Sequence, residues 1–324
     1  MKTQVLPITP ESVALAARLL QQGELVALPT ETVYGIAADA RNGEAVKKIF
    51  EAKGRPQDNP LIVHICGMEM LNGIVSEVPE RAKKLAAAFW PGPLTMIFKK
   101  KDIVPAKATG GLDTVAVRFP NHPVARAIIR AAGLPIAAPS ANSSGKPSPT
   151  RASHVEYDLN GKIDMIVDGG AAEWGLESTI VDVSDEIPMI LRPGAVTKEM
   201  IEEVVGQVEI DPAILHKPTA DFKPKAPGMK YTHYSPKAEV FLVKGEQKAV
   251  AERINALAAA ERAAGKKRKQ RRYIMRISFF LWAAEQNPKK SARTFSKPCG
   301  NLIFWGWMWF IPRSFPKKAR EWRL

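Results

Sequence analysis

Hydrophobic positions in the first 206 residues alternate between short β-branched runs and longer stretches with helical spacing. A helix is predicted to begin at Thr9-Pro10-Glu11, which supply an N-cap, a proline at the first helical position and a first-turn acid, and to end at Gly23. Further helices are predicted over GEAVKKIFEAK, VPERAKKLAAAF, HPVARAIIRAAG and TKEMIEEVV. Strands are predicted at ELVALP, PLIVHI, LTMIFK, TVAVRF, LPIAAP, IDMIVD, STIVDV and PMILRP. This alternation is typical of an α/β domain.

The pattern changes after residue 206. Residues 207–237 lose regular periodicity and carry prolines at short intervals, which predicts an extended linker that is long enough to serve as a lid over a binding site. AEVFLV then restarts a strand, and GEQKAVAERINALAAAERAAG has the spacing of an amphipathic helix, so residues 238–264 begin a second α/β domain. Because twenty-odd residues cannot bury a core, we expect this remnant to be poorly anchored.

Charge and tryptophan are concentrated in residues 265–324. The net charge is +14 at pH 7, but the last 60 residues hold 16 Lys+Arg and 2 Asp+Glu, so residues 1–264 are formally neutral. Three interpretations of this tail stay open: a basic arm for nucleic acid or a membrane surface, a nuclear-localisation-like KKRKQRR segment, and a disordered product of a reading-frame shift. The tail has no helical or strand period, which favours the third.

Several common signatures are absent from the sequence. It contains no GxxxxGK[ST], GxGxxG, HExxH or CxxC, and its two cysteines, Cys66 and Cys299, predict neither a disulfide framework nor a zinc site. The first residues lack the apolar region of a signal peptide, and no run of about 18 apolar residues follows. We therefore expect a cytoplasmic protein that has no membrane segment and no metal held by side chains.

Candidate chemistry lies where strands begin or end. The prolines of KGRPQDNPLIVHI disfavour a helix before them, which predicts an extended segment in which Lys53 and Arg55 face the same way and Gly54 lets a ligand approach the backbone. Ser140 and Asn142 repeat this spacing after the LPIAAP strand. Two cations, a hydroxyl and an amide suit a polyanion such as a triphosphate, and a pair of solvated loops is the alternative.

Further polar residues in or beside the strands have both structural and functional interpretations. Arg118 lies within a strand, where an unpaired guanidinium is costly, so it needs an anionic partner, either a substrate carboxylate or a neighbouring acid. Thr32 is placed to bind a small substrate, whereas His64 is by default a hydrogen-bonded core histidine. Turn chemistry and surface charge also explain Ser178 and Arg192.

Eight segments together are more specific than any one of them. They are LPTETVYGIAADA, KGRPQDNPLIVHI, FWPGPLTMIF, TVAVRFPNHP, PIAAPSANSSGKPSPT, GLESTIVDV, LRPGAV and PGMKYTHYSP. In this order and at these distances they closely resemble the YrdC-type threonylcarbamoyl-AMP synthase family in its long, two-domain form, over about residues 5–264. The resemblance implies a YrdC-like catalytic domain over residues 1–206, built on a twisted, mixed, open sheet flanked by helices, and a Rossmann-like second domain that is truncated here.

The resemblance also implies an activity. Members of this family are ATP-dependent nucleotidyltransferases that join L-threonine, bicarbonate or CO2, and ATP into L-threonylcarbamoyladenylate and release pyrophosphate, with Mg2+ bound to ATP. The product serves the threonylcarbamoyl modification of the tRNA adenosine beside the anticodon, so tRNA and the downstream threonylcarbamoyl-transfer machinery are implied partners. An amine and CO2 form a carbamate without an enzymatic nucleophile, which agrees with a sequence that shows no Ser-His-Asp or Cys-His set.

Residue roles follow from the same resemblance. Catalytic roles fall on Lys53, Arg55, Ser140 and Asn142. Contacts with L-threonine fall on Thr32, His64, Arg118, Ala138 and Ser178. Contacts with ATP fall on Arg55, Asn59, Thr114, Ser140, Ser148, Arg192 and one linker tyrosine, either Tyr231 or Tyr234. Thr114 is expected near both substrates.

Two other functions stay open from the sequence. The first is a double-stranded RNA or tRNA-binding module without catalysis; the neutral charge of residues 1–264 disfavours it, although a local patch that includes Lys53, Arg55 and Arg118 is compatible with it. The second is the carbamoyl-transfer module of hydrogenase maturation, which shares this domain type. The chain lacks the acylphosphatase and zinc-finger segments that accompany that module.

Overall fold

The computed structural model describes residues 2–215, 226, 240–244, 247–263, 273–276 and 320–323. The chain divides into two compact units, Met1–Tyr231 and Thr232–Leu324. Tyr231, Tyr234 and Cys299 lie outside the described residues. The first unit carries all the other residues that the sequence singled out as a candidate site.

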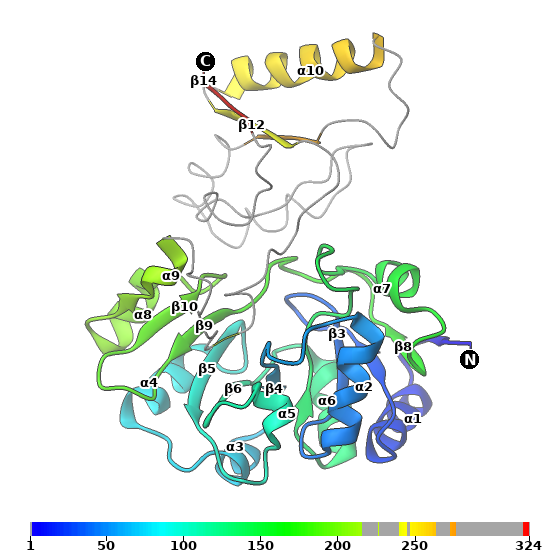
Figure 1. Cartoon of the computed structure of the whole chain (residues 1–324), viewed down its shortest axis with the longest axis vertical. Coiled ribbons are helices and arrows are strands. Elements are labelled where there is room, and N and C mark those ends of the chain that lie inside the picture. Colours follow the sequence, from blue (N-terminus) through cyan, green and yellow to red (C-terminus); the bar gives the residue numbers. More distant parts are fainter. Residues whose placement is uncertain are drawn as a thin grey trace. The chain divides into compact units, whose positions relative to one another are not determined.

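An open sheet forms the centre of the first unit (Figure 1). Across it, the described residues form eleven strands in the order β1 (Gln4–Pro7), β8 (Met165–Asp168), β2 (Val26–Leu28), β3 (Gly35–Asp39), β7 (Ile136–Ala137), β4 (Ile62–His64), β6 (Thr114–Arg118), β5 (Leu94–Lys99), β9 (Thr179–Asp182), β10 (Met189–Arg192) and β11 (Glu209–Ile210). Five neighbouring pairs are parallel and five are antiparallel. The predicted α/β fold with an open, mixed sheet is therefore confirmed.

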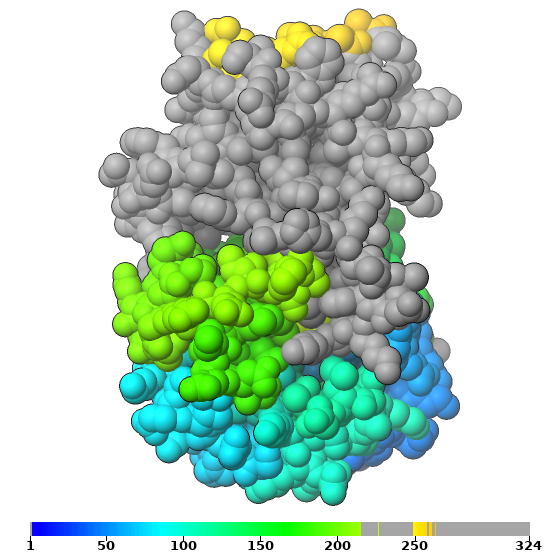
Figure 2. All heavy atoms as spheres, turned by 60° about the vertical axis from the view of Figure 1, so that its left-hand side comes forward, coloured from blue at the N-terminus to red at the C-terminus, as the bar shows by residue number. Residues whose placement is uncertain are grey.

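Helices flank this sheet. They are α1 (Pro10–Gln21), α2 (Gly43–Lys53), α3 (Met68–Ile74), α4 (Glu80–Phe89), α5 (Ala106–Thr109), α6 (Pro123–Ala132), α7 (Ala152–Leu159), α8 (Lys198–Val205) and α9 (Pro212–Leu215). Thr9 and Ser12 form a capping box at the start of α1, and left-handed glycines, Gly54 and Gly133, end α2 and α6. Helices α1 and α6 pack together, and α4 and α8 lie side by side, cyan and yellow-green in Figure 2.

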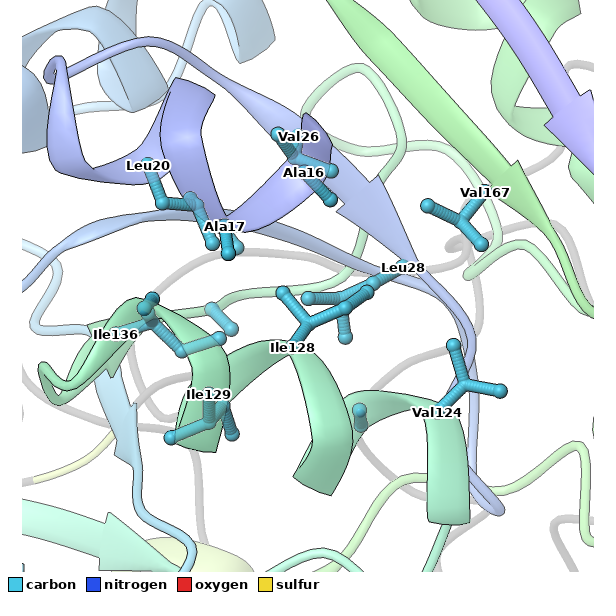
Figure 3. Packing of buried hydrophobic residues seen from close by; sticks show 14 of the residues in the cluster. Ala16, Ala17, Leu20, Val26, Leu28, Val124, Ile128, Ile129, Ile136 and Val167 are labelled. Atoms are coloured by element: carbon cyan, nitrogen blue, oxygen red, sulfur yellow. The ribbon is translucent and has the colours of Figure 1, made fainter. Parts of the chain in front are cut away.

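A large hydrophobic cluster lies between α1, α6 and the sheet (Figure 3). Leu20 of α1 and Ile128 of α6 face Leu28 of β2 and Val167 of β8, and all four are fully buried. Strands β2 and β4 are buried along their whole length, which explains why β2 is continuously apolar and why β4 is apolar apart from His64 at its end. This packing holds the central strands, and hence the ends that carry polar residues, in place.

The elements predicted from hydrophobic patterning are confirmed, and the structure adds others. Strand β3 could not be predicted from the sequence, because GIAAD is rich in alanine and glycine, which have weak strand preference. Its pairing with β2 and β7 stabilises it as a strand. The short elements β1, α3, α5 and α7 were also missed. Strand β11 and helix α9 lie within residues 207–237, the stretch expected to be a linker. The domain boundaries stay a prediction.

Beyond residue 215, one further residue of the expected linker is described within the first unit, and it is buried. Ala226 is 0% exposed. It packs in a cluster with residues from five strands, namely Ile62, Ala116, Ile97, Ile180 and Leu191. At this position the linker therefore contacts one face of the sheet.

The second unit contains a small parallel sheet. Its strands are β12 (Val240–Lys244), β13 (Tyr273–Arg276) and β14 (Arg320–Arg323), with β12 in the middle and parallel to both neighbours. Helix α10 (Gln247–Ala263) joins β12 to β13, which is a strand–helix–strand crossover. A Rossmann-like identity for this unit and the origin of residues 265–324 stay predictions. Among the described helices, none has both the length and the apolar character needed to cross a membrane.

Replacing Ile128 by alanine tests whether the α1–α6 cluster stabilises the first unit. Ile128 is fully buried, so we expect Ile128→Ala to lower the free energy of unfolding by about 2–5 kcal/mol, because it removes buried methyl groups and leaves a cavity. Ile103→Ala is the control, since Ile103 is 49% exposed, and a change within about 0.5 kcal/mol is expected there. Urea denaturation followed by circular dichroism measures both, and equal effects would contradict the assignment.

Candidate active site

Polar residues from four strands lie in one row across the sheet. His64 of β4 pairs in register with Arg118 of β6, Arg118 with Thr95 of β5, Thr95 with Ile180 of β9, and, after a β-bulge, Ile180 with Arg192 of β10. Residues in register on neighbouring strands point to the same face of a sheet. The sheet thus brings together three candidates that are far apart in the sequence: His64, Arg118 and Arg192.

Arg118 is the centre of the first polar cluster. It is 4% exposed, and its guanidinium donates from Nη1 to Thr32 Oγ1 at 2.8 Å and from Nε to the Gly92 carbonyl at 3.2 Å. Its Nη2 lies 2.7 Å from Glu31 Oε1, as an ion pair rather than a well-aligned hydrogen bond. The expectation that Arg118 needs an anionic partner is confirmed, and Glu31 is that partner in the ligand-free protein.

Burial shifts the protonation of two groups beside Arg118. Burial is the largest single influence on Glu31 and would raise its pKa, but the charge of Arg118 together with hydrogen bonds to the carboxylate outweighs burial, so the net effect is a lowered pKa and an ionised carboxylate. Burial, and then the charge of Arg118, lower the pKa of His64 to about 3, so this imidazole is neutral at neutral pH. His64 is 3% exposed, and its Nδ1 has no hydrogen-bond partner among the described residues. The default interpretation of a satisfied core histidine is therefore wrong for this nitrogen.

A second polar cluster adjoins the first. Ser178 Oγ lies 2.8 Å from Thr95 Oγ1, and Arg192 donates to the Ser178 carbonyl from Nε at 3.1 Å and from Nη2 at 2.9 Å. Glu177 bridges two donors, because its Oε2 accepts from Arg192 Nη1 at 2.8 Å and its Oε1 accepts from Ser148 Oγ at 2.7 Å. Ser178 is buried and Arg192 is partly buried, so both belong to one hydrogen-bonded network rather than to surface charge and turn chemistry.

Lys53 differs from its expected position. Helix α2 runs through Lys53, and Gly54 ends the helix in the left-handed region at φ 59°, so the segment is not extended and Lys53 and Arg55 do not project together. Lys53 is 3% exposed, and its ammonium donates to the Ser140 carbonyl and, at 2.6 Å, to the Asn142 carbonyl. The glycine serves as a helix cap, and the lysine fixes the loop that carries Ser140 and Asn142.

Burial also changes the charge state of Lys53. Desolvation, followed by the charge of Arg55, lowers the pKa of Lys53 to about 7, although Glu177 and Asp158 act in the opposite direction. The Lys53 nitrogen also lies 3.5 Å from Asn142 Oδ1, so three acceptors surround it, one for each hydrogen of the protonated amine. Because Glu177 raises the pKa of Lys53, Lys53 and the loop of Ser140 and Asn142 that it holds lie within electrostatic range of the second polar cluster.

The remaining candidates lie around these clusters. Arg55 donates from Nη2 to the Pro60 carbonyl at 3.0 Å, and Asn59 is buried with an Oδ1 that has no partner among the described residues. Ala138 is buried beside β4, where its N–H donates to the Ile62 carbonyl at 2.9 Å. Thr114 begins β6, about 13 Å along the strand from Arg118, and its expected place near both substrates stays a prediction.

Sequence reasoning missed Glu31, Glu177 and Thr95. The two acids stand directly before Thr32 and Ser178, and a buried arginine demands an acid nearby, so this demand was the available signal. Thr95 carried no signal beyond its place in an apolar strand. Within the described ranges, no group of three or more His, Cys, Asp or Glu side chains could hold a metal ion.

Comparison with known proteins identifies the family. Residues 18–194 match the Sua5–YciO–YrdC family model, described as "Telomere recombination", and residues 196–298 match "Threonylcarbamoyl-AMP synthase, C-terminal domain". A threonylcarbamoyl-AMP synthase of Pyrococcus abyssi is 52% identical over 255 residues, which is 79% of this chain and 74% of that protein. The chain belongs to the threonylcarbamoyl-AMP synthase family. The resemblance seen in the sequence motifs is thereby confirmed, and the chain is an enzyme of this family.

Other family members support the same assignment. A threonylcarbamoyl-AMP synthase of Bacillus subtilis is 53% identical over 244 residues, which cover 75% of this chain and 70% of that protein. The crystal structure of Pyrococcus abyssi Sua5 complexed with L-threonine has a TM-score of 0.78 and 43% identity, and the match covers 94% of this chain and 92% of that one. These similarities extend past residue 206, the end of the predicted catalytic domain.

Replacing Lys53 by methionine tests the charge state of this buried amine. The pKa of Lys53 is about 7 in the folded protein and near 10.5 in an unfolded chain, so between these values the unfolded chain binds more protons and stability rises with pH. We expect the free energy of unfolding of the wild type, relative to Lys53→Met, to rise by about 1 kcal/mol per pH unit between pH 7.5 and 9.5. Urea titrations at each pH measure this difference; parallel pH curves would contradict it.

Proposed function

We propose that this chain joins L-threonine, bicarbonate or CO2, and ATP into L-threonylcarbamoyladenylate and releases pyrophosphate. The observation that carries the proposal is the polar row across the sheet, where Arg118 and His64 lie in register and Thr95 links them to the Ser178–Arg192 network. One end of this row offers groups that suit an amino acid, and the other end offers donors that suit phosphate oxygens.

Arg118 is suited to bind the carboxylate of L-threonine. Its guanidinium is oriented by Thr32, Gly92 and Glu31, and a planar guanidinium binds a carboxylate through two parallel hydrogen bonds. His64 stays neutral beside it, so it adds no second positive charge, and its Nδ1 is left for a substrate hydrogen bond. Ala138 and Ser178 complete the expected L-threonine contacts.

The reaction requires no nucleophile from the protein. The amine of L-threonine forms a C–N bond with CO2 and loses a proton, which gives a carbamate. A carbamate oxygen then bonds to the α-phosphorus of ATP, the bond to the β-phosphate oxygen breaks, and pyrophosphate leaves with the bonding electrons. The protein therefore positions the reactants and neutralises phosphate charge, for which Arg55, Arg192 and Ser148 are available. Mg2+ would enter with ATP as part of that substrate.

The four expected catalytic residues divide into two kinds. Lys53 holds two carbonyls of the loop, and Asn142 Nδ2 donates to the carbonyls of Ser143 and Lys146, each at 2.8 Å. These two side chains shape the loop from within. Ser140 is half-buried at its surface, and Arg55 lies in the loop that follows α2, so we assign contact with ATP to these two.

A lid over the reactants is part of the proposal. Ala226 packs on Ile62 and Ala116, which lie two residues before His64 and Arg118 on the same strands and therefore on the same face of the sheet. At Ala226 the chain therefore lies next to the polar row. A linker tyrosine, Tyr231 or Tyr234, is the expected further ATP contact, and a lid over the site would keep water from the labile adenylate; both tyrosines lie outside the described residues.

The role of the product also belongs to the proposal. L-threonylcarbamoyladenylate would pass to the cytoplasmic machinery that modifies the tRNA adenosine beside the anticodon. An RNA-binding module without catalysis explains less, because it gives no reason for Arg118 and His64 to be buried in one row. The hydrogenase-maturation module shares the domain type, but residues 196–298 of this chain match the C-terminal domain of threonylcarbamoyl-AMP synthase.

Pyrophosphate release from ATP tests the proposed function. We expect release by the purified chain to depend on both L-threonine and bicarbonate, and a shorter chain ending at Lys237 measures what the second unit contributes. Equal rates would show that residues after Lys237 are dispensable. A folded chain that binds ATP but releases no pyrophosphate under any of these conditions would contradict the proposed reaction.

Replacing Arg118 by lysine tests its role in binding L-threonine. Lysine keeps the charge opposite Glu31 but loses the planar fork, so we expect the KM for L-threonine to rise about 30-fold or more while the Kd for ATP stays unchanged. Arg41→Lys is the matched control, because Arg41 pairs with Asp39 on the surface. Steady-state kinetics and ATP titrations measure the two constants, and parallel losses in both would point to a general structural defect instead.

A further inference from the structure

We propose that Glu177 is an internal substitute for phosphate, which occupies the donors of the ligand-free site and is displaced from them when ATP binds. This inference rests on the proposed function, because it concerns how the same site holds ATP and pyrophosphate. A carboxylate that must be displaced weakens the binding of phosphate groups, so Glu177 would favour the release of pyrophosphate after each reaction.

The contacts of Glu177 carry the first step of the argument. Its two carboxylate oxygens accept from Ser148 Oγ at 2.7 Å and from Arg192 Nη1 at 2.8 Å. Ser148 and Arg192 are the two residues of this cluster that are expected to contact ATP. Carboxylate and phosphate oxygens are both anionic acceptors, and they compete for the same N–H and O–H groups. The triphosphate and Glu177 therefore cannot use these donors together.

Arg192 can change its anionic partner without moving. Its Nε and Nη2 both donate to the Ser178 carbonyl, at 3.1 and 2.9 Å, and Nη2 also donates to Ser178 Oγ at 3.1 Å. These bonds fix the plane of the guanidinium from behind and leave the Nη1 edge toward Glu177. A phosphate oxygen that replaces Glu177 at this edge meets a donor that is already oriented.

The backbone around Glu177 is also fixed. A Cβ atom on Gly194 would lie 2.6 Å from the Glu177 carbonyl and 2.4 Å from the Thr179 nitrogen, so only glycine lets these segments approach so closely. Two residues after Glu177, Thr179 Oγ1 donates to the Val196 carbonyl at 2.6 Å. Because these contacts hold the main chain from the Glu177 carbonyl onward, Glu177 would leave the donors by rotating its side chain.

Charge balance gives the reason for such an arrangement. Glu177 pairs with Arg192 at 2.8 Å, and its charge favours the protonated form of Lys53, an effect that Asp158 shares and that Arg55 opposes. Without an anion, the positive charges of this partly buried site would repel one another. In the ligand-free protein Glu177 supplies the anion, and once the triphosphate is bound the same carboxylate repels it.

Glu177→Gln tests the inference, because glutamine keeps an oxygen acceptor of the same size and removes the charge. We expect the variant to bind inorganic pyrophosphate about tenfold more tightly than the wild type in isothermal titration calorimetry with chelator present, so that no metal ion takes part. The matched control is Glu202→Gln on α8, which removes the same charge from a carboxylate 2.5 Å from Lys198. No change in pyrophosphate affinity is expected there.

A second variant separates the effect of the charge at position 177 from the effect of altering the side chain. Glu177→Asp keeps the charge but shortens the side chain, so it cannot reach both donors, and its pyrophosphate affinity is expected to lie between those of the wild type and Glu177→Gln. Equal affinity in the wild type and Glu177→Gln, or weaker binding by the variant, would overturn the inference while leaving the proposed function standing. If neither the wild type nor the variants bind pyrophosphate or ATP, the proposed function is overturned with it.

Discussion

The site depends on a buried guanidinium that is fully supported by its surroundings. Arg118 at the end of β6 meets Glu31, Thr32 and the Gly92 carbonyl, which come from two turns on either side of the strand. Removing one partner of a buried ion pair costs about 3–5 kcal/mol, because the other charge is left without compensation. The turn that carries Glu31 supplies the opposite charge. The register of β6 places Arg118 beside His64, and the charge of Arg118 helps to keep His64 neutral.

The same principle recurs at the other cations of the site. Lys53 meets two backbone carbonyls, and Arg192 meets Glu177 and the Ser178 carbonyl. Each of these cations is held by internal acceptors before any substrate arrives, so little reorganisation is needed when an anion binds. Where the internal acceptor is itself a carboxylate, as at Arg192, we propose that the binding of a phosphate group exchanges one anion for another.

The open mixed sheet makes this arrangement possible. Parallel β4 and β6 bring His64 and Arg118 to the same edge, and antiparallel β5 places Thr95 next to them although its chain runs the other way. Ala226 packs in the hydrophobic cluster that contains Ile62 and Ala116, which lie two residues before His64 and Arg118 on the same strands. The polar row and the packing contacts of Ala226 therefore lie on the same face of the sheet.

The sequence by itself determined the α/β class, most helices and strands, and the residue set of the family. Capping residues, left-handed glycines and apolar runs are local signals, so α1, α6 and β4 could be predicted from neighbouring residues alone. The motifs likewise pointed to Arg118, His64 and Arg192 without showing that they share a row.

Only the tertiary structure decided how these residues act. Local rules made Lys53 and Arg55 a forward-facing pair, but α2 extends through Lys53 because its end is fixed by Gly54 and by carbonyls 87 and 89 residues away in the chain. Glu31 and Glu177 could not be recognised from spacing, because the role of each acid depends on the arginine with which it pairs in the folded protein. Strand register, which pairs residues distant in sequence, is set by packing of the whole unit, and it is this register that turned scattered polar residues into one site.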